Sequence, residues 1–112
     1  MIVCKISSRE AALRIDELLA IDGIDVFFVG PADLAQTMGR PGETHHPDVM
    51  ALQLQVFERV VAAGKVAGAT ASNLERDLAA GDRYFIAPDF RLLMDTAREF
   101  VPRGSLLTAA RG

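Results

Sequence analysis

The sequence lacks the features that mark several large classes of protein. A single cysteine, Cys4, excludes an internal disulfide framework and is typical of a reducing cytoplasm. Twelve basic residues against fifteen acidic ones leave a net charge of −3, which gives no electrostatic case for binding nucleic acid or an anionic membrane. No apolar run approaches the roughly 20 residues that span a bilayer, and the N-terminus lacks the pattern of a signal peptide. We therefore expect a cytoplasmic protein that binds neither nucleic acid nor membrane.

What the sequence does contain is an alternation of strand-like and helix-like segments. A length of 112 residues, half of them hydrophobic, indicates one domain with a real core. Short apolar runs, typical of strands, are each followed by a segment whose apolar residues recur at helical spacing, and this pattern occurs four times. We expect strands over 2–6, 24–29, 65–69 and 84–87, and helices over 9–20, 34–38, 47–63, 74–79 and 90–100. We expect the domain to span residues 1–101 and a flexible tail to span residues 102–112.

This order of elements predicts the fold class. Strands that alternate with helices lie parallel in one sheet, so we expect an α/β fold of four β/α units. Such a set equals half of an eight-stranded (β/α) barrel, whereas a complete barrel typically needs about 250 residues. Three arrangements stay open: a small open sheet, a sheet whose edges pair with another chain, or a fragment of a longer barrel.

The stretch from Val26 to Leu34 is the centre of this pattern. Residues 26–29 are β-branched or aromatic without a polar break, as in a strand that is buried on both faces. Gly30 and Pro31 end that strand, so Asp33 lies just past its C-terminal end, where ligands of α/β proteins bind. The alternative is that Asp33 only caps the helical turn over 34–38.

Three other residues, two histidines and one cysteine, are candidates for a site. His45 and His46 are adjacent in a loop rich in glycine and proline, and two histidines without further ligands are a weak indication of metal. We expect both to be exposed to solvent. Cys4 lies in an apolar run, and we expect it to pack rather than to act as a nucleophile.

The central stretch also carries a family resemblance. The matching residues are the segment 29–34 (Val-Gly-Pro-Ala-Asp-Leu), supported by Asp25, Gly39, Pro41-Gly42, His46-Pro47 and residues 62–65. With them the chain resembles the HpcH/HpaI family of class II pyruvate aldolases, which includes 2,4-dihydroxyhept-2-ene-1,7-dioate and 2-keto-3-deoxy-sugar-acid aldolases. The resemblance runs from about Val3 to Phe100 and corresponds to the C-terminal half of the family's barrel.

The resemblance implies a function and a site. It implies metal-dependent cleavage of 4-hydroxy-2-keto acids to pyruvate and an aldehyde, with a small 2-keto acid as the ligand. Asp33 would ligate a divalent metal, Mg²⁺ or Mn²⁺, and Gly30, Ala32 and Asp33 would line the pocket for the pyruvate carboxylate. Hard cations of this kind take oxygen ligands and stabilise an enolate as Lewis acids.

The chain also departs from the family pattern. The family's second metal ligand, a glutamate, is matched by Ser7, and Lys5 brings a positive charge close to the site. The family's catalytic histidine and substrate-binding arginine come from the N-terminal barrel half, so no catalytic residue is assigned here. We therefore expect a truncated or degenerate aldolase with little activity alone. The alternative is a non-catalytic half-barrel that forms a homo-oligomer or pairs with a separate N-terminal half.

Overall fold

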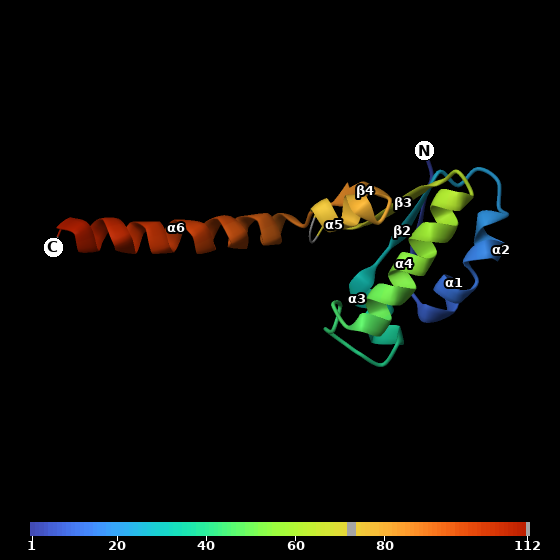
Figure 1. Ribbon diagram of the computed structural model, residues 1–112, viewed down its shortest axis with the longest axis horizontal. Coiled ribbons are helices and arrows are strands. Elements are labelled where there is room, and N and C mark those ends of the chain that lie inside the picture. Colours follow the sequence, from blue (N-terminus) through green and yellow to red (C-terminus); the bar gives the residue numbers. More distant parts are fainter. Residues whose placement is uncertain (72–73, 112) are drawn as a thin grey trace.

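The computed structural model describes residues 1–71 and 74–111, and its centre is one sheet of four parallel strands (Figure 1). The strands, which lie in chain order, are β1 (Val3–Ile6), β2 (Val26–Val29), β3 (Val66–Thr70) and β4 (Asp82–Ile86). The helices are α1 (Arg9–Leu13), α2 (Ile15–Leu19), α3 (Pro31–Thr37), α4 (Pro47–Ala62), α5 (Leu74–Ala79) and α6 (Asp89–Arg111). The predicted α/β fold of parallel β/α units is confirmed.

The strand register divides the side chains of the sheet between two faces. Ile6 pairs with Val29, and both enter the core on the face that the helices cover. The residues that alternate with these along each strand lie on the other face. There the register places one residue from each strand side by side, in the order Lys5, Phe28, Gly68 and Tyr84. Among these residues the Phe28 and Tyr84 rings meet edge to face, with their centroids 6.2 Å apart.

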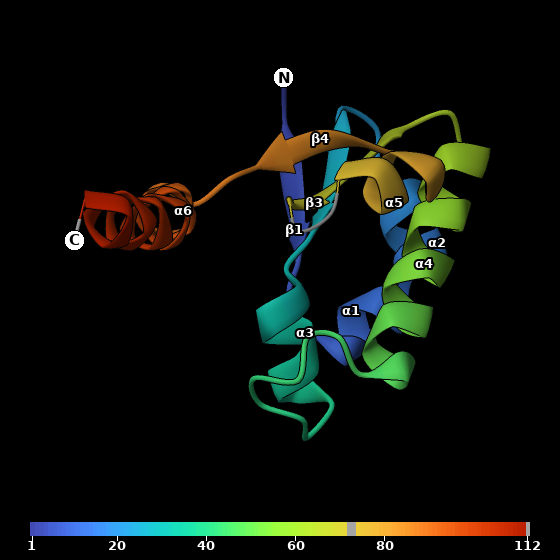
Figure 2. The ribbon, with the colours of Figure 1, turned by 60° about the vertical axis from the view of Figure 1, so that its left-hand side comes forward.

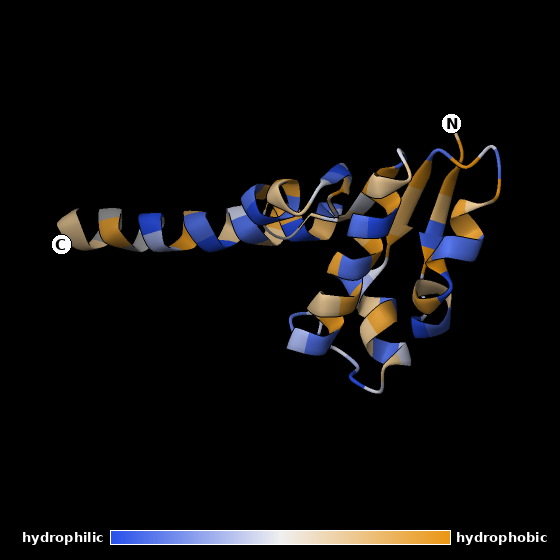
Figure 3. Ribbon diagram, turned by 45° about the vertical axis from the view of Figure 1, so that its right-hand side comes forward, coloured by the Kyte–Doolittle hydropathy of each residue, from blue (hydrophilic) through white to orange (hydrophobic). Residues whose placement is uncertain are grey.

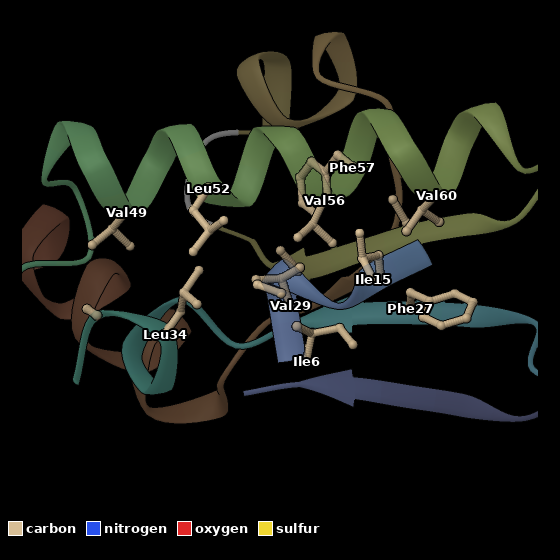
Figure 4. Close-up of a cluster of buried hydrophobic side chains, with 14 residues drawn as sticks. Ile6, Ile15, Phe27, Val29, Leu34, Val49, Leu52, Val56, Phe57 and Val60 are labelled. Atoms are coloured by element: carbon tan, nitrogen blue, oxygen red, sulfur yellow. The ribbon is translucent and has the colours of Figure 1, made fainter. Parts of the chain in front are cut away.

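The core lies between the sheet and α4 (Figure 4). Helix α4 presents a stripe of buried side chains at helical spacing: Val49, Leu52, Val56, Phe57 and Val60. Phe27 of β2 and Leu34 of α3 meet this stripe and are fully buried. Figure 2 shows α1, α2 and α4 gathered on one side of the sheet. Cys4 is half-buried against this core, as we expected.

The first helical segment differs from its prediction. The expected helix over 9–20 is two short helices, because Arg14 leaves helical geometry at φ −101° and ψ 22°. Its guanidinium binds Glu17 at 2.7 Å, so the break is covered by an exposed ion pair. Ser8 is the N-cap of α1, since its hydroxyl accepts from the Ala11 N–H at 3.1 Å.

The C-terminal elements are also shifted. Strand β4 covers Asp82–Ile86 rather than residues 84–87, and a register irregularity lies beside it, at Ala67/Gly68. Helix α6 continues to Arg111 rather than ending at residue 100, with Pro102 inside it. Flexibility of residues 102–112 stays a prediction, and residue 112 lies outside the described part of the chain.

Helix α6 projects away from the sheet, which makes the molecule 65 Å long (Figure 1). Figure 3 shows that apolar and polar residues alternate along it. Within residues 1–71 and 74–111, no helix combines the length and the apolar character that crossing a bilayer requires. Location in the cytoplasm stays a prediction.

Candidate functional site

The candidate site is built on the turn that leaves β2. All four residues of β2 are buried, which anchors the end of the strand at Val29. The N–H of Gly30 donates to the Ile6 carbonyl at 3.0 Å and extends the pairing of β1 with β2 by one bond. Pro31 then takes the first position of α3, where its fixed φ suits a helix and its missing N–H does no harm. The turn is therefore fixed from both sides.

Asp33 belongs to the first turn of α3 and does not cap a later helix. The cap position is occupied by Gly30, and the helix begins at Pro31 rather than at residue 34. The Asp33 carboxylate instead turns to β1, where its Oδ2 lies 2.6 Å from Nζ of Lys5. The capping alternative is therefore wrong, and the predicted closeness of Lys5 to the site is confirmed.

The ends of two side chains occupy the space beside Gly30. A Cβ at this position would lie 2.8 Å from the Lys5 Cε and 2.8 Å from the Asp33 Oδ2. A larger residue here would therefore push these two side-chain ends aside. The Gly30 N–H is also bound to Ile6, and Gly30 can therefore contribute space but no hydrogen bond to a ligand.

The turn opens into a groove of about 680 Å³ at the C-terminal edge of the sheet. The groove is lined by all three residues that the family resemblance assigns to the keto-acid carboxylate: Gly30, Ala32 and Asp33. Lys5 lines the same groove, as does Arg91 near the start of α6. The N–H groups of Ala32 and Asp33 belong to the first turn of a helix, where the helix itself supplies no acceptor. A small anion could therefore meet both N–H groups and an ammonium in one place.

The residues present do not by themselves fit a divalent metal. Asp33 offers one carboxylate, and Lys5 already holds it. Ser7 follows β1 directly and brings an exposed, neutral hydroxyl in place of a second carboxylate. Within residues 1–71 and 74–111, no three His, Cys, Asp or Glu side chains gather closely enough to hold a metal ion. Mg²⁺ is usually anchored by one or two carboxylates with several waters, and Lys5 already occupies the Asp33 carboxylate.

The two histidines have separate roles. His46 is the N-cap of α4, because its Nδ1 accepts from the Asp48 N–H at 3.2 Å, and it is half-buried rather than exposed. His45 is exposed, as we expected, and it lines the groove. Sequence reasoning missed this placement, since nothing in a nine-residue polar loop predicts which of its side chains turns back toward the sheet.

Sequence reasoning also missed a buried carboxyl group, which lies at the N-terminal end of the edge strand β4. Asp82 begins β4 and is fully buried, and its Oδ1 accepts from the Tyr84 N–H at 3.2 Å. Its Oδ2 has no hydrogen-bond partner among the described residues. Burial, reinforced by the nearby Asp77 charge, raises the pKa of Asp82 to about 6, although backbone N–H groups oppose the shift. Because this group lies at the N-terminal end of a parallel strand, it is remote from the Asp33 turn.

Comparisons with known proteins identify a matching family and similar relatives. The family described as "HpcH/HpaI aldolase/citrate lyase" matches residues 1–85. A hydroxypyruvate/pyruvate aldolase of Roseobacter denitrificans is 31% identical over 106 residues, which are 91% of this chain and 41% of that protein. A 2-keto-3-deoxy-L-rhamnonate aldolase of Klebsiella pneumoniae is 43% identical over 67 residues, covering 60% of this chain and 25% of that protein.

Solved structures show the same relationship. A HpcH/HpaI aldolase/citrate lyase family protein from Burkholderia cenocepacia J2315 superposes with a TM-score of 0.81 at 27% identity, covering 98% of this chain and 42% of that one. The citrate synthase SbnG has a TM-score of 0.77 at 26% identity, covering 99% of this chain and 45% of that one. The chain thus spans less than half the length of these relatives. It belongs to the HpcH/HpaI aldolase/citrate lyase family.

Proposed function

We propose that this chain provides the keto-acid-binding half of an aldolase that cleaves 4-hydroxy-2-keto acids to pyruvate and an aldehyde. One observation carries the proposal: the family match over residues 1–85 includes the Gly30–Asp33 turn, which lines the groove at the C-terminal edge of the sheet. Barrel enzymes carry their active sites at that edge. The relatives named as pyruvate and keto-deoxy-sugar-acid aldolases support the substrate class.

The proposed binding mode uses backbone groups. The carboxylate of a 2-keto acid would accept from the N–H groups of Ala32 and Asp33, which lie at the positive end of the α3 dipole. Gly30 leaves the space beside them open. No residue of this chain is proposed as the general acid or base.

The family's aldolases depend on a metal. The resemblance assigns Mg²⁺ or Mn²⁺ to the position of Asp33. Because Lys5 holds that carboxylate, the native chain is not expected to bind such an ion there. Ser7 does not supply the second carboxylate, so we expect the isolated chain to behave as a degenerate member with little turnover.

Amide-resolved NMR tests the binding mode. Titration of the ¹⁵N-labelled chain with pyruvate is expected to shift the Ala32 and Asp33 amide resonances, and pyruvamide, which lacks the carboxylate, should leave them in place. If pyruvate moves neither resonance, the proposed site is wrong. Loss of the pyruvate methyl signal in D₂O, measured with Mg²⁺, is expected not to exceed the metal-only control. Robust exchange would show that the site is active after all.

A second candidate, a half-barrel that self-associates or pairs with a separate N-terminal half, is favoured by the open sheet. Strands β1 and β4 are both edge strands, and α1, α2 and α4 gather on one side of the sheet. Phe28 and Tyr84 lie on the other face, which a complete barrel would enclose. Sedimentation equilibrium is expected to show a dimer or a larger homo-oligomer, whereas a well-behaved monomer would count against self-association.

A further inference from the structure

We propose that the Lys5 ammonium is the resident cation of Asp33 in this chain, and that it excludes divalent metal ions from this site. The inference rests on the proposed function only in taking Asp33 as the position where the family binds its metal. It assigns to Lys5 the control over which cation the site accepts.

The first support is the directness of the contact. Nζ of Lys5 lies 2.6 Å from Oδ2 of Asp33, so the ammonium and the carboxylate are in direct contact with no atom between them. Mg²⁺ needs carboxylate oxygens at about 2.0–2.1 Å in an octahedral shell. An ion on this oxygen would therefore lie against a second positive charge, and one of the two cations has to leave.

The second support is that the fold places the two partners opposite each other. The backbone of Lys5 is fixed by its register with Phe28 in the sheet, and the backbone of Asp33 is fixed by the first turn of α3. Gly30 leaves room for the lysine stem, because a Cβ there would come within 2.8 Å of Lys5 Cε. The two side chains are 55% and 45% exposed, so they meet at the surface of the turn between β2 and α3.

The third support is that Ser7 is neutral and brings no carboxylate to the position where the resemblance places the second metal ligand. Among the described residues, no three His, Cys, Asp or Glu side chains gather closely enough to hold a metal ion. Glu10, the next acidic residue along the chain, is exposed on α1 and lies 3.7 Å from the Arg14 guanidinium. The charges of Lys5 and Asp33 balance each other without a metal ion, and a divalent ion at Asp33 would add positive charge beside Lys5.

Binding of Mn²⁺, followed by the EPR signal of the free ion, tests the inference. The variants are Lys5→Gln, which removes the charge, and Lys5→Arg, which keeps it. Lys65→Gln is the matched control, because it changes the net charge equally. Lys65 lies directly before β3, at the N-terminal ends of the strands, whereas Asp33 follows their C-terminal ends. We expect Lys5→Gln to bind Mn²⁺ at least about tenfold more tightly than the native chain, while Lys5→Arg and Lys65→Gln match the native chain.

Further variants connect the effect to Asp33. The double variant Lys5→Gln/Ser7→Glu is expected to bind Mn²⁺ more tightly still, and adding Asp33→Asn should abolish the gain. Native affinity for Mn²⁺ equal to that of Lys5→Gln overturns the inference, as does a gain that survives Asp33→Asn. The pyruvate titration of the native chain in EDTA separates the two proposals, because failure of pyruvate to bind refutes the proposed function and leaves the Mn²⁺ result unaffected.

Discussion

Helices α4 and α6 are the two long helices of the molecule, and they differ in what lies against them. Helix α4 has 16 residues and buries one stripe of five apolar side chains against the sheet. Helix α6 has 23 residues, yet Phe90, Leu93 and Phe100 are each more than 60% exposed. Every residue of α6 whose side chain is described is exposed. Apolar residues at helical spacing thus produce a helix in both places, but only α4 obtains stability from tertiary packing.

The largest expected effect is at the packed helix. Phe57→Ala removes a ring that is 2% exposed, and we expect it to lower the free energy of unfolding by about 3–5 kcal/mol through lost burial and a cavity. Leu54→Ala, on the exposed side of the same helix, is the control and should change it by less than about 1 kcal/mol. Urea denaturation measures both values. Equal losses would mean that the α4 stripe does not carry the core.

The second effect concerns β4, the strand that leads from the packed region to α6. Because the pKa of Asp82 is about 6 when folded and near 3.8 when unfolded, the folded state binds more protons between these values. This group therefore makes stability fall as pH rises from about 4 to about 6, and the loss persists above that range. The total is up to about 3 kcal/mol, at about 1.4 kcal/mol for each pH unit.

A pair of asparagine variants isolates this contribution. Asp82→Asn keeps an oxygen for the Tyr84 N–H and removes the charge, so this fall in stability should disappear. Asp22→Asn, at an exposed loop position, should retain it. Denaturation midpoints of the three proteins at pH 4, 5, 6 and 7 give the comparison, and parallel curves for all three would contradict the assignment to Asp82.

The third effect is the change in stability when a glycine is replaced by alanine, in the sheet and in α6. A Cβ on Gly68 would lie 2.6 Å from the Tyr84 carbonyl oxygen, so Gly68→Ala must move the backbone of β4. We expect a loss of about 1–3 kcal/mol. Gly104→Ala meets nothing within 4 Å and should be neutral or stabilising by up to about 1 kcal/mol, because alanine is the better helix former. Thermal unfolding followed by circular dichroism distinguishes the two.

The smallest expected effect on the isolated chain is in α6. Leu93 is 72% exposed, so Leu93→Ser should change its free energy of unfolding by no more than about 0.5 kcal/mol. If the chain self-associates through α6, the same variant should instead lower the association constant in sedimentation. A large loss in a monomeric sample would show that α6 packs on the chain's own sheet, contrary to the structure.

Much of the candidate site could be predicted because its signals are local. The buried run over 26–29 and its end at Gly30-Pro31 place Asp33 at the sheet edge, and the charge of Lys5 was expected nearby. What could not be predicted is that the Gly30 N–H donates to the Ile6 carbonyl, so that Gly30 offers a ligand space but no hydrogen bond. That assignment depends on the pairing of two strands that are separated by two helices, which no local pattern specifies.

The sequence by itself determined the alternation of strands and helices and the apolar stripe of α4, because each depends on residues close together in the chain. It also determined the family, through a match that runs over residues 1–85. Only the tertiary structure decided that Lys5 meets Asp33 at 2.6 Å and that Asp82 is buried without a partner for one oxygen among the described residues. Contacts of this kind follow from register and from which faces the helices cover. The same holds for α6, whose helical pattern is visible in the sequence, while its lack of cover is a property of the fold.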